Sequence, residues 1–99
     1  VYIFSITNMS GLLSTDYIDL YKALSHTLRV EILSLLIHQP QDVSQLCERL
    51  HKRQPNISQH LRKLKKAEIL TCEKKGKKRQ YSVASRYQPL ISYLDKHTI

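Results

Sequence analysis

Apolar residues in the stretch 53–66 recur with the spacing of one face of an α-helix. Ile57, Leu61 and Leu64 stand at positions i, i+4 and i+7, which predicts a buried stripe. Pro55 falls in the predicted first turn, where its missing N–H costs nothing and its fixed φ suits a helix start. The stretch is therefore predicted to be an amphipathic helix with one polar face.

The polar face of this helix has an uneven chemistry. Its leading end carries amides and one hydroxyl, at Gln54, Asn56, Ser58 and Gln59. Its trailing part carries cations, at Arg62, Lys63 and Lys66. Amides can read the edges of bases, whereas cations hold phosphates. A surface helix whose polar face is only solvated is the alternative, and this stretch by itself leaves both interpretations open.

Two helices are predicted near the start of the chain, over residues 16–24 and 28–37. Thr15 is the expected N-cap of the first helix. The second helix is strongly apolar, and its expected core positions are Leu28, Ile32, Leu35 and Leu36.

A third helix is predicted over residues 43–51. Asp42 with Gln45 three positions later forms the pattern of a capping box at its start. A short basic turn, Lys52 and Arg53, then leads directly into the amphipathic helix. Two short helices joined by a tight turn predict a helix-turn-helix with its second helix exposed.

After residue 67 the apolar period changes from that of a helix to that of strands. Residues 69–74 and 78–83 are predicted strands of a hairpin with Gly76 at its tip. The hairpin is strongly basic, with Lys74, Lys75, Lys77, Lys78 and Arg79. We expect it to be a wing that contacts phosphates or the minor groove. The alternative is an edge hairpin that lysines protect from aggregation.

A last helix is predicted from about residue 87, with Ser85 as a candidate cap. The order of elements predicts a mainly α fold with a small β-hairpin (α+β), a winged helix-turn-helix over residues 15–99. Residues 1–14 are predicted to be an N-terminal arm or extension, either disordered or β-prone. The apolar stripes of the first and last of the five helices exceed what so small a core can cover. We therefore expect a homodimer interface formed by Tyr17, Ile18, Tyr21, Leu24, Leu90, Ile91 and Leu94.

The positive charge is concentrated in one half of the chain. The 99 residues contain 16 Lys and Arg against 8 Asp and Glu, a net charge of +8. Residues 49–79 hold twelve of these cations and only two acids, Glu68 and Glu73. A basic half joined to a mildly acidic half points to a polyanionic partner. Nucleic acid fits better than a membrane surface, because no long basic amphipathic helix with exposed aromatic residues accompanies the charge.

The chain resembles the ArsR/SmtB family of winged-helix repressors. The residues that carry the resemblance are ALSHTLRVEILSLL, QPNISQHLRKLKKAEIL and the wing KKGKKRQYSV, within a match over residues 17–83. The resemblance implies a homodimer that binds an inverted-repeat operator in double-stranded DNA and represses transcription. It also implies that Gln54, Ser58, Gln59 and His60 lie where the family contacts bases and phosphates.

The chain departs from the family pattern at several positions. Arg53 replaces a Ser that often precedes the recognition helix, which removes a cap and adds a phosphate contact. Glu68 replaces a Gly before the wing, so that helix end cannot be a relaxed glycine cap. The cysteines of the family's metal motif fall on Asp42 and Ser44, and its last-helix metal pattern is reduced to 95–97 (Asp-Lys-His). We therefore expect no metal site and no cofactor.

The remaining reactive side chains do not form a catalytic pattern. Cys47 lies on a predicted buried stripe, where a core role is favoured over a sensor, and Cys72 alternates with Glu73 along the first wing strand. Without a CxxC motif, reduced thiols in a cytoplasmic protein are expected. No carboxylate pair or Ser/His or Cys/His constellation indicates an enzyme. A winged-helix module that binds RNA or a protein through its basic face remains the alternative function.

Overall fold

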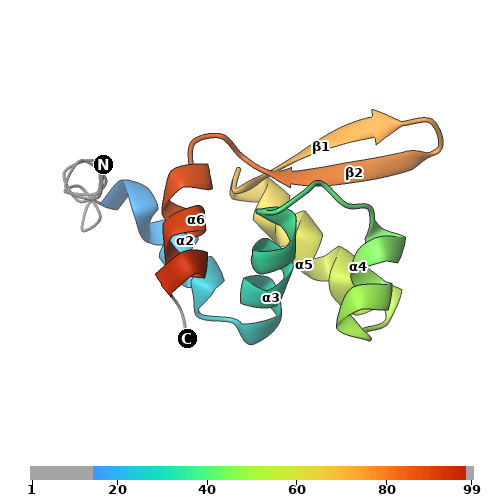
Figure 1. The fold of residues 1–99 in the computed structure, drawn as a ribbon, viewed down its shortest axis with the longest axis horizontal. Helices are drawn as coiled ribbons and strands as arrows, with labels where there is room; N and C mark the ends of the chain where they lie inside the picture. The colour runs from blue at the N-terminus through green and yellow to red at the C-terminus, as the bar shows by residue number, and fades with distance from the viewer. Residues whose placement is uncertain (1–14, 98–99) are drawn as a thin grey trace.

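The computed structural model describes residues 15–97, and the predicted arm 1–14 lies outside the described residues. The described chain begins with a 3-10 turn, Thr15–Tyr17. The elements that follow are α2 (Ile18–Leu24), α3 (Thr27–Leu36), α4 (Val43–Leu50), α5 (Gln54–Lys66), β1 (Leu70–Lys75), β2 (Lys78–Val83) and α6 (Gln88–His97). The predicted order of helices and strands is confirmed, and together they form a winged helix-turn-helix (Figure 1).

The start of the first helix differs from the prediction. The α-helix begins at Ile18, its N-cap is Tyr17, and no side chain caps it. Thr15 belongs to the preceding 3-10 turn, so the prediction that Thr15 caps this helix was wrong. Short 3-10 turns are frequent at the N-terminal ends of α-helices.

The helix-turn-helix is formed by α4 and α5. The predicted capping box is confirmed, because Asp42 Oδ1 accepts from the Gln45 N–H at 2.9 Å and Gln45 Oε1 accepts from the Asp42 N–H at 2.9 Å. The helix α4 ends at His51, which has a left-handed backbone with φ 55°. The chain can therefore turn within three residues and enter α5.

The two strands form an antiparallel hairpin with a two-residue loop. Lys75 pairs with Lys78, so the loop consists of Gly76 and Lys77. Gly76 has φ 63°, a value that glycine adopts without strain at the first loop position of a type II′ hairpin. Gln41 and Tyr81 exchange two backbone hydrogen bonds, of 3.1 and 2.8 Å. The loop before α4 thereby fastens the hairpin to the helix-turn-helix.

The core lies where the helices and the start of the hairpin meet. The predicted stripe of α5 is confirmed, since Ile57, Leu61 and Leu64 are buried. On α3 the expected core residues Ile32 and Leu36 are buried and Leu28 and Leu35 are half-buried, whereas the buried Leu33 was not expected. Other buried residues include Leu20, Ala23, Leu46, Ile69, Leu70, Val83 and Tyr87.

The residues predicted for a dimer interface fall into two groups. Ile18 is 43% exposed, and Tyr17, Tyr21, Leu24 and Leu94 are half-buried. In contrast, Leu90 and Ile91 are buried in the core of their own chain, at 6% and 4% exposure. The prediction that these two side chains form the interface was therefore wrong, because α6 uses them to pack on the rest of the monomer.

The elements are arranged along the long axis of the molecule. Helices α2 and α6 lie at one end, and the hairpin projects beyond α4 at the other end (Figure 1). The helix-turn-helix and its wing are thus distant from the end where a second copy was expected to bind. Within residues 15–97, no helix has the length and apolar character needed to span a membrane.

Candidate nucleic-acid interface

The leading end of α5 presents polar side chains to solvent. Gln54, Asn56 and Gln59 are exposed, whereas Ser58 is half-buried. Arg53 is the N-cap residue and is exposed, and its side chain makes no capping hydrogen bond, as the departure from the family pattern predicted. These side chains point outward because the buried stripe of α5 faces the core. The amides are therefore accessible to base edges.

The trailing part of α5 presents cations. Arg62, Lys63, Lys65 and Lys66 are all exposed. Lys65 was not among the predicted contact residues, although its position on the helix placed it within the basic segment. Cations in the last turn also interact favourably with the helix dipole, which stabilises α5 before any partner binds.

His60 does not lie on this exposed face. Its side chain is buried, with 9% exposure, and its Nδ1 accepts a hydrogen bond from Arg29 Nε at 3.2 Å. The ring of His26 lies beside it, with 4.4 Å between the ring centroids. The prediction that His60 contacts a phosphate was therefore wrong in this structure, because its ring is turned into the contact between α5 and α3.

The cations of the wing are exposed on a narrow hairpin. Lys74, Lys75, Lys77, Lys78 and Arg79 are all exposed. Two of them have carboxylate partners: Lys75 Nζ lies 3.0 Å from Glu73 Oε1, and Lys78 Nζ lies 3.6 Å from Asp42 Oδ2. The pair of Lys75 with Glu73 is exposed on both sides and contributes little free energy, so a phosphate can replace Glu73 at small cost. The ion pair of Lys78 also joins the wing to the cap of α4.

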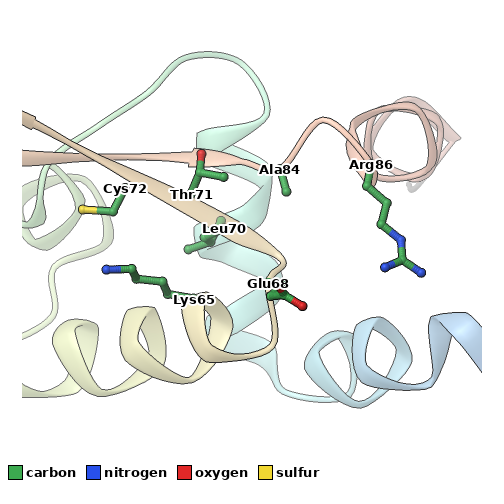
Figure 2. Close-up of a pocket in the computed structure, with 7 residues that line it drawn as sticks. All are labelled: Lys65, Glu68, Leu70, Thr71, Cys72, Ala84 and Arg86. Carbon is green, nitrogen blue, oxygen red and sulfur yellow. The ribbon is translucent and has the colours of Figure 1, made fainter.

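A shallow hollow lies beside the hairpin, where α5 ends and α6 begins. Its lining includes Lys65, Glu68, Cys72 and Arg86. In Figure 2 the Lys65 side chain extends beneath the strand that carries Cys72, and Arg86 lies at the other end. Lys65 and Arg86 add positive charge beside the wing, but the hollow is too open to enclose a small-molecule ligand.

The two cysteines are free thiols and lie on different elements. Cys47 is on α4 and Cys72 is on β1, and both are half-buried, so Cys47 is less covered than its predicted place on a buried stripe implied. Cys72 is the cross-strand partner of Tyr81. Burial, followed by the neighbouring Cys72, raises the pKa of the Tyr81 hydroxyl.

The positions that correspond to the family's metal sites serve other contacts here. Asp42 caps α4, and Asp95 accepts a hydrogen bond from Ser34 Oγ at 3.0 Å and lies 3.0 Å from His38 Nε2. Across residues 15–97, no three His, Cys, Asp or Glu side chains are grouped so that they could hold a metal ion. Asp95 thus links α6 to α3 in the monomer.

Three contacts were not visible in the sequence: the hydrogen bond from Arg29 to His60, the ring contact of His26, and the ion pair of Lys78 with Asp42. Arg29 and His60 stand 31 positions apart, and no periodicity relates them. The Arg in the second helix and the His in the recognition helix are both part of the quoted family pattern, which was the only available signal.

The family model of the bacterial regulatory proteins of the arsR family matches residues 26–71, which include α3, α4, α5 and the first residues of β1. Over this segment the chain is similar to the ArsR family. The match includes the polar face of α5 and ends before the cations of the wing.

Among the curated relatives of the chain is the HTH-type transcriptional repressor SmtB of Mycobacterium tuberculosis, 35% identical over 69 residues. These residues make up 70% of this chain but only 51% of SmtB, so the chain spans about half the length of that relative.

Solved structures share the fold. HlyU from Vibrio cholerae superposes with a TM-score of 0.80 at 26% identity, over 86% of this chain and 94% of that one. The homodimeric winged helix-turn-helix DNA-binding domain Mb0332 from Mycobacterium bovis superposes with a TM-score of 0.75, over 89% of this chain and 82% of that one. At 20% identity, the second likeness concerns the fold alone.

Proposed function

We propose that this chain is a sequence-specific double-stranded DNA-binding regulator that acts as a homodimeric repressor in the cytoplasm. The observation that carries the proposal is the division of the exposed surface of α5. Its leading end presents the amides of Gln54, Asn56 and Gln59, and its trailing end presents cations. This division suits an α-helix that enters the major groove with its N-terminal residues on the bases.

Each group of exposed side chains has its own role in this proposal. Base readout is assigned to Gln54, Asn56, Ser58 and Gln59. Phosphate contacts are assigned to Arg53, Arg62, Lys63, Lys66 and the wing cations Lys74, Lys75, Lys77, Lys78 and Arg79. The phosphate contacts supply affinity for any duplex, whereas the amides select among sequences.

The homodimer would form at the end of the molecule that is remote from the wing. Ile18 is an apolar side chain exposed on α2, and half-buried Tyr21 and Leu94 extend the apolar surface. A two-fold axis at this end would place two copies of α5 on one face. Half-sites about 34–36 Å apart then correspond to one turn of DNA and to an inverted repeat.

RNA or a protein is the alternative partner of the basic face. A reader of single-stranded RNA is expected to present aromatic side chains on which bases stack. Apart from Pro55, the exposed side chains of α5 are amides and cations, and Tyr81 on β2 of the wing is half-buried. The chemistry of the exposed face therefore favours duplex DNA.

A selection from random duplexes, followed by gel shifts at 150 mM salt, tests the proposal. We expect one enriched inverted repeat, bound at least about a thousandfold more tightly than unrelated duplex. Its two single strands and an RNA duplex of the same sequence serve as matched controls. Equal binding of all these probes would contradict the proposal and support the alternative.

A further inference from the structure

The buried stripe of the recognition helix contains one titratable side chain. Three of the buried residues of α5 are aliphatic, and the fourth is His60. Its imidazole lies against the start of α3, where Arg29 donates to it and the ring of His26 lies beside it. The contact between the recognition helix and the start of α3 thus includes a group that can gain a proton.

The hydrogen bond from Arg29 determines the proton state of His60. An arginine Nε always carries a hydrogen and cannot accept. Because Arg29 Nε lies 3.2 Å from His60 Nδ1, Nδ1 must be the acceptor, and the single ring proton of the neutral imidazole must be on Nε2. A protonated imidazole has hydrogens on both nitrogens, so two donors would then face each other.

The surroundings of His60 also oppose a positive charge. Burial lowers the pKa of His60 from its ordinary value of 6.5, and His26, Arg29 and Lys63 lower it further, in that order. His26 and Arg29 approach from the start of α3, and Lys63 lies on α5 itself. These three side chains are the charged or titratable groups that act on His60 in the described chain, and all are basic.

We propose that His60 is a proton-sensitive positioning residue, whose neutral form holds α5 against α3 and whose protonation loosens that contact and weakens DNA binding. Its effect on DNA rests on the proposed function. Gln59 and Ser58 immediately precede His60, so a displacement of His60 moves the side chains assigned to base readout. The chain would release its operator on acidification.

The sign of the effect follows from the lowered pKa. The unfolded chain binds a proton on this residue at a higher pH than the folded chain does. The contribution of His60 to stability is therefore complete above about pH 6.5 and is lost as the pH falls through the folded-state pKa. Any positive charge that the protein gains at lower pH strengthens its attraction to DNA, so variants must be compared at each pH.

Nuclear magnetic resonance of the intact chain without DNA tests the contact itself. Ring nitrogen shifts should show the proton of His60 on Nε2 at pH 7.5, and His60 should titrate below 6.5. In Arg29→Gln, the loss of the guanidinium should raise the pKa of His60. A proton on Nδ1, titration at or above 6.5, or an unchanged pKa in Arg29→Gln would each overturn the proposal.

Amide exchange of α5 tests the loosening. Between pH 7.5 and 5, after correction for intrinsic rates, exchange should accelerate by up to about tenfold for each unit by which the pKa of His60 is lowered. His60→Asn keeps an amide oxygen near the position of Nδ1 and cannot titrate. Amide exchange of α5 in this variant should therefore not accelerate at low pH. His51→Asn is the matched control, because it removes an exposed imidazole at a left-handed position that asparagine tolerates, and it should accelerate like the natural chain.

Fluorescence anisotropy with the duplex selected above tests the consequence for DNA. From pH 7.5 to 5.5, the natural chain and His51→Asn should lose affinity relative to His60→Asn. Parallel curves for all three proteins would overturn the proposal even if DNA binding is specific. A chain that selects no duplex would refute the proposed function, while the resonance and exchange measurements would still decide the role of His60.

Discussion

Two residues of the helix-turn-helix and its wing have a left-handed backbone without being glycine. His51, at the end of α4, has φ 55°, and Glu68, after α5, has φ 61°. The left-handed turn at Glu68 lets the Ile69 N–H reach the Leu64 carbonyl at 3.0 Å, which closes α5 in the manner of a glycine cap. Glu68, which has a Cβ, therefore adopts the left-handed conformation that glycine usually provides at this position.

Replacing Glu68 by Gly should stabilise the protein. The left-handed conformation costs a residue with a Cβ about 1–2 kcal/mol, and the greater freedom of glycine in the unfolded chain offsets about 0.5–1 kcal/mol. Urea unfolding should therefore show Glu68→Gly to be more stable by about 0.5–1 kcal/mol. Lys66→Gly, in the last turn of α5, is the control and should destabilise by about 1 kcal/mol. A loss of stability in both variants would contradict the argument.

At the same scale, side chains of α5 and of the wing should differ in how they contribute to DNA binding. Gln59→Ala should cost about 1–3 kcal/mol on the selected duplex and relax the sequence preference at one position. Lys77→Ala or Lys75→Ala should weaken all duplexes alike and reduce the salt slope by about one unit. Gel shifts over a salt series measure both effects. Equal loss on selected and random DNA for Gln59→Ala would reverse the assignment.

At the scale of elements, the sequence predicted what periodicity and capping determine. The capping box of α4, the stripe of α5 and the hairpin around Gly76 depend on neighbours within a few positions, and all three are confirmed. The burial of Leu90 and the contact of His60 with Arg29 depend on which faces of distant helices meet. An apolar stripe shows that a helix face is covered but does not show what covers it. The choice between a core and a dimer interface for α6 was therefore beyond the sequence.

Deleting residues 86–99 should unfold the monomer and not merely separate a dimer. Tyr87, Leu90 and Ile91 are buried in the core, and each such side chain contributes about 1.5–3 kcal/mol. Their joint loss approaches the whole stability of a small domain, about 5–15 kcal/mol. Circular dichroism and size exclusion should show an aggregating chain with reduced helix content. A truncated chain that is a folded monomer would show that α6 serves the interface alone.

At the scale of the whole molecule, the two ends have separate tasks in the proposed homodimer. Ile18→Glu places a charge on the exposed apolar surface of α2 and should give a folded monomer in sedimentation at micromolar concentration. Val30→Glu is the matched control, because Val30 is a similarly exposed apolar residue, at 39%, on α3 and outside the predicted interface. It should remain a dimer. A monomeric natural chain would refute the dimer, and a dimeric Ile18→Glu would place the interface elsewhere.

The whole molecule should also lack a tight transition-metal site. A stable zinc site normally needs about four N, O or S donors, whereas Asp42 here caps α4 and Asp95 contacts Ser34 and His38. Calorimetric titration of the reduced protein with zinc should therefore show only weak binding, and a gel shift should be unchanged by the metal. Tight stoichiometric binding that releases DNA would contradict this expectation. Variants of Cys47, Cys72 and His97 would then identify the ligands.

The two faces of α5 have a consequence for how such proteins can diverge. Ile57, Leu61 and Leu64 hold the helix in place, whereas Gln54, Asn56 and Gln59 are exposed and absent from the core. Exposed substitutions of this kind usually change stability by no more than about 0.5 kcal/mol. Duplicated copies of the gene could therefore acquire new operators by exchanging a few outward residues, with the fold left intact throughout.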